Sequence, residues 1–102
     1  MFFWLYRYNE NIINMEKIKE ELVEKGFEDT VLFESPNYKS AIVGYDVVTG
    51  KVIYSYDLMI EHLMTVDGMT DEEAIDFINY NTIRAIPYMG EKSPIILTDF
   101  NE

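Results

Sequence analysis

The chain has 102 residues, with 19 aspartates and glutamates against 8 lysines and arginines, and its formal net charge is −11. This length corresponds to one domain, and a hydrophobic fraction of 48% indicates a folded chain rather than a disordered one. The negative charge disfavours direct binding to nucleic acid or to an anionic membrane surface, and the lack of cysteine excludes disulfides and thiolate chemistry in this chain.

The first 14 residues contain an apolar run that is too short for a membrane span and lacks the features of a secretory signal. The run consists of Phe2, Phe3, Trp4 and Leu5. Two interpretations stay open: the run packs on the body as a strand or anchor, or it joins two copies in a homodimer. Either Met1 or Met15 is the biological start. We therefore expect an N-terminal extension or anchor over residues 1–14, a single α+β domain over residues 15–102, and a cytoplasmic location.

Residues 14–25 have the pattern of an amphipathic helix. Apolar side chains recur at a spacing of three and four residues, at Met15, Ile18, Leu22 and Val23. Gly26 follows as the residue that ends such a helix in a left-handed conformation.

Three short segments in the next part of the chain have the composition of strands, because Val, Ile, Phe and Tyr dominate them and turn residues separate them. They are Thr30–Ser35, Ser40–Asp46 and Lys51–Tyr56. Gly50 can adopt the positive φ angle that closes a hairpin, with Asp46 where the turn begins. We expect a three-stranded antiparallel meander.

Two helices and a strand are predicted in the second half. Asp57 is expected to cap a helix over residues 58–66. Thr70 and Glu73 have the spacing of a capping box, which predicts the start of the next helix. Pro87 disfavours helix at the residue before it, and residues 94–100 are predicted to form the last strand.

Together these elements predict an α+β fold in the order α-β-β-β-α-α-β. Its sheet is expected to have three or four strands and to be mainly antiparallel. An amphipathic helix buries one stripe, so the helices are expected to pack on one face of that sheet.

His62 is the only histidine and a candidate metal ligand or general base, because imidazole titrates near neutral pH. It lies on the apolar side of its helix with no second histidine at a ligand spacing, so we favour a structural role. A phosphate-binding loop is also disfavoured, because five residues instead of four separate Gly44 from Gly50 and Val52 follows in place of Ser or Thr. We predict no catalytic residue, no metal site and no cofactor.

Acidic side chains gather on the first helix and at the start of the helix after Thr70. They are Glu16, Glu20, Glu24, Asp71, Glu72, Glu73 and Asp76. One interpretation is that these acids cap helices and form a solvated face. The other is that they form a partner-binding face, an array similar to phosphates that binds the basic groove of a nucleic-acid-handling protein.

Arg84 stands near the end of a predicted helix, where its charge complements the helix dipole. A structural interpretation makes it a clamp between the last helix and the sheet. A functional interpretation makes Asn79, Asn81 and Arg84 a small polar pocket for an anion or for an acidic group of a partner.

Residues Phe77 to Tyr88 have the motif FI-x-YNT-x-RA-x-PY. The motif lies within a segment, from Glu34 to Ile96, that resembles a family of small, uncharacterised acidic proteins of bacteria and phages. The resemblance implies no catalytic residues, because that family has no assigned activity. Some small acidic proteins of mobile elements block host nucleases, and anti-CRISPR proteins are among them.

From these patterns we expect a non-enzymatic protein-interaction module, a phage or mobile-element inhibitor that mimics nucleic acid towards a basic partner. Two alternatives stay open. The first is a small anion-binding protein or enzyme with a pocket at Arg84, and the second is a homodimeric structural module.

Overall fold

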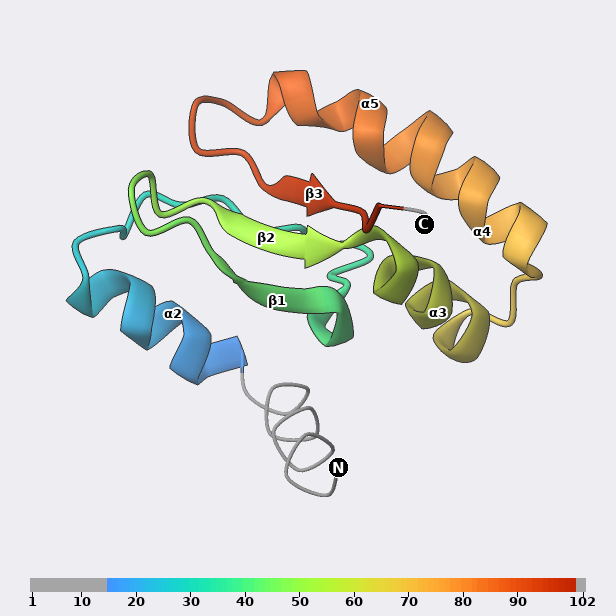
Figure 1. Cartoon of the computed structure of the whole chain (residues 1–102), viewed down its shortest axis with the longest axis horizontal. Helices are drawn as coiled ribbons and strands as arrows, with labels where there is room; N and C mark the ends of the chain where they lie inside the picture. The colour runs from blue at the N-terminus through green and yellow to red at the C-terminus, as the bar shows by residue number, and fades with distance from the viewer. Residues whose placement is uncertain (1–14, 101–102) are drawn as a thin grey trace.

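A three-stranded sheet forms the centre of the molecule (Figure 1). This computed structural model describes residues 15–100. Its elements in chain order are α2 (Met15–Glu24), the 3₁₀ turn η1 (Lys39–Ala41), β1 (Ile42–Tyr45), β2 (Val52–Ser55), α3 (Tyr56–Val66), α4 (Asp71–Phe77), the π-helical turn η2 (Ile78–Thr82), α5 (Ile83–Ala85), the 3₁₀ turn η3 (Ile86–Tyr88) and β3 (Ile95–Leu97). The predicted α+β class is confirmed, although one of the predicted strands does not form.

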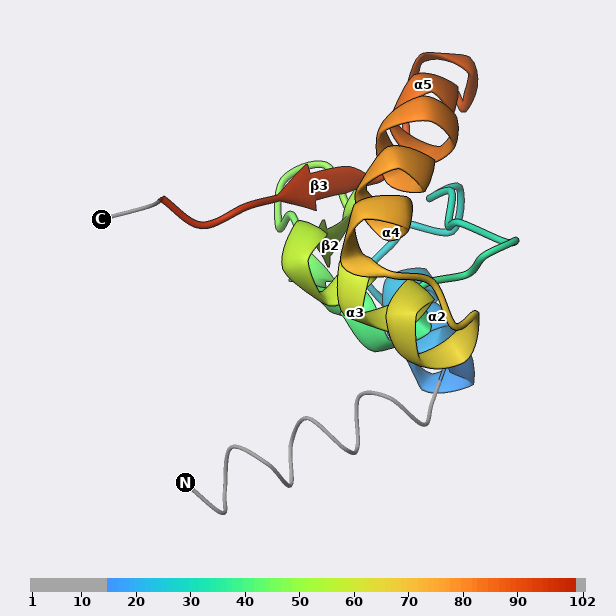
Figure 2. The same cartoon turned by 90° about the vertical axis from the view of Figure 1, so that its right-hand side faces the viewer.

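α2 and the run from α4 to α5 pack on one side of the sheet, as predicted, whereas α3 lies at its end. Figure 2 shows α2 and the run from α4 to α5 on the same side of the strands. The helix α3 continues directly from β2 at the end of the sheet (Figure 1). No helix of residues 15–100 covers the opposite face, which we call the open face; the face towards the helices is the inner face (Figure 2).

The sheet is mixed and has three strands in the order β1-β2-β3. β1 pairs with β2 in antiparallel orientation, whereas β2 pairs with β3 in parallel orientation. The expectation of a mainly antiparallel sheet is therefore corrected. The parallel pairing follows from the connection, because a long crossover through α3, α4 and α5 returns the chain to the same end of the sheet.

The segment Thr30–Ser35, predicted as the first strand of a meander, forms no strand. Its backbone groups bond elsewhere: the Phe33 N–H donates to Tyr54 Oη at 3.2 Å, and the Val31 N–H donates to the Lys92 carbonyl at 3.2 Å. The Phe33 ring also packs against the Tyr54 ring, with 4.7 Å between centroids. The segment thus crosses the inner face of the sheet instead of extending its edge.

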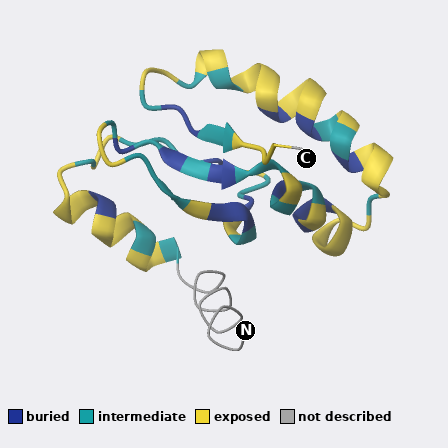
Figure 3. Cartoon of the chain, viewed as in Figure 1, coloured by how far each residue is buried: buried dark blue, intermediate teal, exposed yellow. Residues whose placement is uncertain are grey.

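The hydrophobic core is formed by buried residues of β1, β2, the helices and the segment before β1 (Figure 3). Val52 and Tyr54 of β2 point into it and are 1% and 0% exposed. Side chains alternate along a strand, so Ile53 between them points to the open face. Other fully buried side chains come from η1, the helices and the segment before them: Tyr38, Ala41, Met59, Leu63, Ala74 and Ile78.

The predicted hairpin between β1 and β2 is confirmed. The Gly50 N–H donates to the Asp46 carbonyl at 2.7 Å, and the Asp46 N–H donates to the Lys51 carbonyl at 2.8 Å. The Asp46 carboxylate also accepts from Thr49 Oγ1 at 2.7 Å and from the Val48 N–H at 3.1 Å. These bonds favour the ionised carboxylate and lower the pKa of Asp46 below its usual value.

Side-chain caps define where α3 and α4 begin. The Leu58 N–H donates to Ser55 Oγ at 3.3 Å, so Ser55 caps α3, and Asp57, the predicted cap, lies in the first turn. At α4 the predicted capping box is present. The Glu73 N–H donates to Thr70 Oγ1 at 3.1 Å, and the Thr70 N–H donates to the Glu73 carboxylate at 2.9 Å.

The helical run that begins with α4 continues to Tyr88. Ile86 keeps helical angles, with φ −55° and ψ −45°, so the predicted break at this residue is corrected. Pro87 is accommodated because it lies in the first turn of η3, where a missing N–H removes no helical bond. The π-helical turn η2 interrupts the run with wider i→i+5 bonding.

The expectations placed on residues 1–14 lie outside the described residues. They are the extension or anchor, the homodimer contact through Phe2–Leu5 and the biological start. Among residues 15–100, no helix combines the length and the apolar character needed to cross a membrane.

We predict that Gly50→Ala lowers the free energy of unfolding by about 3 kcal/mol. Gly50 has a φ of +79°, and an added Cβ would overlap the ring of Phe27. Urea unfolding followed by circular dichroism measures the loss.

Gly26→Ala is the matched control. Gly26 also has a positive φ, of +88°, but nothing lies within 4 Å of an added Cβ. This variant should lose only the backbone contribution, about 1 kcal/mol. Equal losses in the two variants would contradict the role of the Phe27 contact.

Candidate functional site

The hairpin formed by α3 and α4, which we call the acidic hairpin, carries charge of one sign. Between Tyr56 and Phe77 the chain has seven aspartates and glutamates and no lysine or arginine. All seven are exposed: Asp57, Glu61, Asp67, Asp71, Glu72, Glu73 and Asp76. Three of them lie in the first turn of α4, where the positive end of the helix dipole stabilises negative charge.

The predicted acids of α2 form a separate group. Glu16, Glu20 and Glu24 are exposed, but Lys17 and Lys19 alternate with them along the helix. α2 and α4 lie at opposite ends of the molecule (Figure 1). The structure therefore brings the four predicted acids of α4 together with those of α3, and it does not bring the α2 acids to them.

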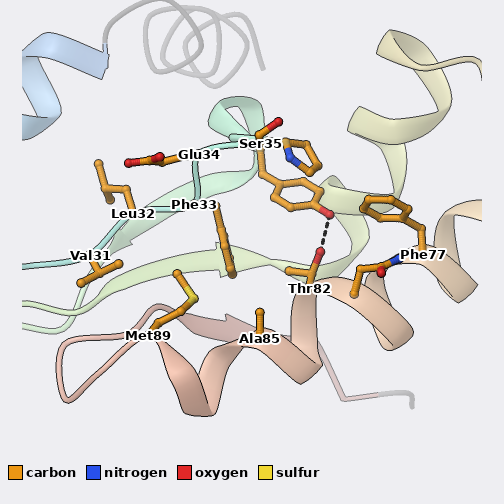
Figure 4. Close-up of a pocket in the computed structure, with 12 residues that line it drawn as sticks. Val31, Leu32, Phe33, Glu34, Ser35, Phe77, Thr82, Ala85 and Met89 are labelled. Carbon is orange, nitrogen blue, oxygen red and sulfur yellow. Dashed lines mark hydrogen bonds between the residues drawn. The ribbon is translucent and has the colours of Figure 1, made fainter.

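A groove of about 360 Å³ lies between residues 31–36 and the helical run that follows α4 (Figure 4). The side chains that line it are mainly apolar, and they include Val31, Leu32, Phe33, Tyr38, Phe77 and Met89. Glu34 is the charged residue in the lining. A groove of this size and character can accept an apolar side chain of a partner.

The groove adjoins the acidic hairpin. Phe77 at the end of α4 lines the groove, and the exposed Asp76 precedes it. Burial raises the pKa of Tyr38, which also lines the groove, and Asp67 is close enough to add to that shift. A basic and partly apolar partner surface could contact both features at once.

The structure places the three residues of the predicted polar pocket in different surroundings. Asn81 lines the groove, whereas Asn79 Oδ1 accepts a hydrogen bond from Tyr56 Oη at 3.3 Å. Arg84 is exposed, and its guanidinium lies over the Tyr80 ring, 5.3 Å from the centroid. Residues two positions apart on a helix do not face each other, which separates Asn79 from Asn81. Arg84 makes a contact within its own helical run and lies outside the groove lining.

A polar network that sequence analysis did not identify ties the segment before β1 to the helices. Tyr38 Oη and Thr82 Oγ1 form a hydrogen bond of 2.7 Å, drawn in Figure 4. Ser40 Oγ and His62 Nδ1 form a second hydrogen bond, of 3.1 Å. The ring centroids of His62 and Tyr38 lie 5.6 Å apart. Tyr38 has a φ of +50°, rare outside glycine. Its segment is irregular, so no periodicity marked it as buried.

Burial shifts the pKa values of His62 and Tyr38 in this network, and that of Tyr54 in the neighbouring core. Desolvation lowers the pKa of His62; the charge of Asp67 opposes the shift and Lys39 adds to it. Desolvation also raises the pKa of Tyr38, and it raises that of Tyr54 to about 12. At neutral pH the histidine is therefore neutral and both tyrosines keep their protons. Across the described residues, no three His, Cys, Asp or Glu side chains are grouped so that they could hold a metal ion.

Compared with known proteins, the chain matches no family model, and no curated protein and no solved structure is significantly similar to it. The similarity to small acidic proteins of bacteria and phages stays an expectation from the residues themselves.

We predict that the protein loses stability as the pH falls below about 6.5, the ordinary pKa of histidine. The buried His62 has a lowered pKa, so the unfolded chain binds a proton that the folded chain resists. The contribution is complete above pH 6.5 and is lost as pH falls towards the lowered value. Urea unfolding at pH 7.5 and 5.5 measures the loss.

The variant His62→Gln is the control, since it removes the only histidine and keeps a group that can bond to Ser40. Its stability should change much less over the same interval. An unchanged wild-type stability between the two pH values would contradict the prediction. The lowered pKa of Asp46 does not interfere, because a shift in that direction moves its titration further below the pH interval measured.

Proposed function

We propose that the chain is a non-enzymatic protein-interaction module whose acidic hairpin binds a basic surface of a nucleic-acid-handling protein. The observation that carries the proposal is that all seven acids of the hairpin are exposed with no lysine or arginine among them. A surface of one sign attracts basic proteins and repels nucleic acid and other polyanions.

The packing supports this assignment because it holds the acids on a fixed frame. Met59 and Leu63 of α3 and Ala74 of α4 are 0% exposed, so each helix is anchored in the core by its inner side. The capping box fixes where α4 begins and thus where its first-turn acids project. Charges that are already in place need less ordering when a partner binds.

The distribution of cations supports the choice of this surface over α2. Lysines alternate with the glutamates of α2 and partly cancel their field, whereas the acidic hairpin has no such neighbours in sequence. The acids at the α3–α4 end of the molecule are therefore less compensated within their own elements, although Lys39 of η1 is close enough to α3 to act on His62. A basic partner would approach that end first.

In the phage or mobile-element setting that the family resemblance suggests, such a module would act as an inhibitor. Its acids would occupy a groove in which the partner normally holds nucleic acid, as a nucleic-acid mimic of the anti-CRISPR kind does. The neighbouring apolar groove would then contact non-polar side chains beside the partner's basic residues.

An anion-binding or enzymatic role at Arg84 has less support. Arg84 lies over Tyr80 on the exposed side of its helical run, and the groove lining includes Asn81 but neither Asn79 nor Arg84. An anion would also have to approach a surface whose neighbouring charges are mostly negative.

The test is a pull-down with the immobilised full chain from nuclease-treated bacterial lysate. Raising the salt from about 0.1 M to about 1 M shortens the Debye length from about 10 Å to about 3 Å. We predict that nucleic-acid-binding proteins are retained at low salt and released at high salt. Added duplex DNA should displace the same proteins. Retention at both salt concentrations, or no displacement by DNA, would overturn the proposal.

Two matched triple variants identify the surface. One neutralises the hairpin with Glu61→Gln, Glu72→Gln and Asp76→Asn, and the other neutralises α2 with Glu16→Gln, Glu20→Gln and Glu24→Gln. Both remove three charges, and both leave the capping box intact. We predict that the hairpin variant binds about tenfold more weakly and that the α2 variant binds almost as the wild type does. Equal losses would show that net charge alone acts.

A further inference from the structure

No described helix or strand covers the open face of the sheet (Figure 2). The strand side chains that point to it are mainly apolar. Ile53 of β2 and Ile95 of β3 are register partners and both point to it. Leu97 stands two residues after Ile95 on the same face and is 48% exposed. Val43 of β1 adds a side chain that is 50% exposed.

A bulge in β1 brings Val43 to this face. Ile42 pairs with Tyr54 and Gly44 pairs with Ile53, so β1 has one residue more than β2 in this interval. Two residues of the bulged strand then oppose one residue of its partner. The extra residue keeps Val43 and Gly44 beside Ile53 and returns Tyr45 to the inner face, where its ring contacts Phe27 at 6.1 Å between centroids.

Within β1, β2 and β3, the residues that point to the open face are uncharged, in a chain in which 26% of the residues carry a charge. These residues are Val43, Ile53, Ser55, Ile95 and Leu97, with Gly44 among them. A basic partner of the acidic hairpin gains no ion pair here. An apolar segment, in contrast, would remove these side chains from water at no cost in buried charge.

We propose that Phe2, Phe3, Trp4 and Leu5 of the same chain cover the open face. These four residues form the apolar run that begins the chain's first 14 residues, and aromatic side chains bury a large area when they pack on a sheet. The run and the face are thus complementary in chemistry, since both are apolar and uncharged.

The tether is long enough for this contact. Nine residues, 6–14, connect Leu5 to Met15 at the start of α2, and an extended chain of that length spans up to about 30 Å. Met15 and Ile18 pack against the core on the inner side, and Ile18 lines a groove at the β1 edge together with Val43 and Gly44. The tether must therefore pass around that edge to reach the open face. From there the three strands extend only about 10 Å across the sheet, at a spacing of about 4.8 Å.

A short tether also favours the same chain over a second copy. A segment joined to its own face by a short linker has an effective concentration there in the millimolar range. A second copy must instead approach against a net charge of −11 on each chain.

Trp4 reports on the contact, because it is the only tryptophan. In the native full chain, its fluorescence should peak at shorter wavelength than in the urea-unfolded chain and should be protected from acrylamide quenching. The emission should not change with protein concentration, and light scattering should give the mass of a monomer. A native emission equal to that of the unfolded chain would overturn the proposal. So would a shift that grows with concentration together with a dimer mass, which would assign the face to a second copy.

Three full-chain variants locate the contact. Val43→Lys and Leu97→Lys each place a charge on the open face, at positions exposed enough for the fold to tolerate it, while Val66→Lys changes a 65% exposed valine on α3. Circular dichroism checks that each variant is folded. We predict that the first two move the Trp4 emission to longer wavelength and increase quenching, and that Val66→Lys changes neither. A Trp4 emission that stays the same in both open-face variants would overturn the proposal.

Discussion

The packing of Phe33 between Tyr54 and Tyr38 holds an irregular segment of the chain against the sheet, and the arrangement of the helices depends on it. The ring centroids lie 4.7 Å and 5.6 Å apart, in edge-to-face geometry that adds about 0.5–1.5 kcal/mol per pair beyond burial. Tyr54 Oη also accepts the Phe33 N–H, which a regular strand would have used in a ladder. Tyr38 then bonds to Thr82 in η2, so one series of contacts joins β2 to the last helical run.

This packing uses one face of the sheet and leaves two kinds of surface. The segment around Phe33, α2 and the run from α4 all gather on the inner face, so their polar sides and the seven acids of the acidic hairpin face solvent. The opposite face keeps Val43 and Leu97 about half exposed. Charge and apolar area are therefore separated on the molecule. We propose that the first serves a basic partner and that the second is covered by the chain's own N-terminal residues.

The elements predicted correctly from the sequence depend on interactions between residues close in the chain. Thr70 and Glu73 form their capping box within one turn, and Gly50 closes its hairpin through a bond to Asp46. The helix α2 ends at a glycine with positive φ, as its pattern indicated. At the candidate site, the exposure of the predicted acids followed from polarity alone. Their division into two groups did not, because it depends on where α2 and α4 lie around the sheet.

The amino-acid sequence by itself determined the class of fold, the positions of the helices and the hairpin along the chain, and the sign of the surface charge. Each of these follows from local propensity or from composition. Only the tertiary structure decided that residues 30–35 form no strand, since their partner Tyr54 lies 21 residues from Phe33. It also decided that β3 runs parallel to β2 and that Asn79, Asn81 and Arg84 point to different surroundings. These features depend on contacts between residues far apart in the chain, and no periodicity or local motif encodes which distant surfaces meet.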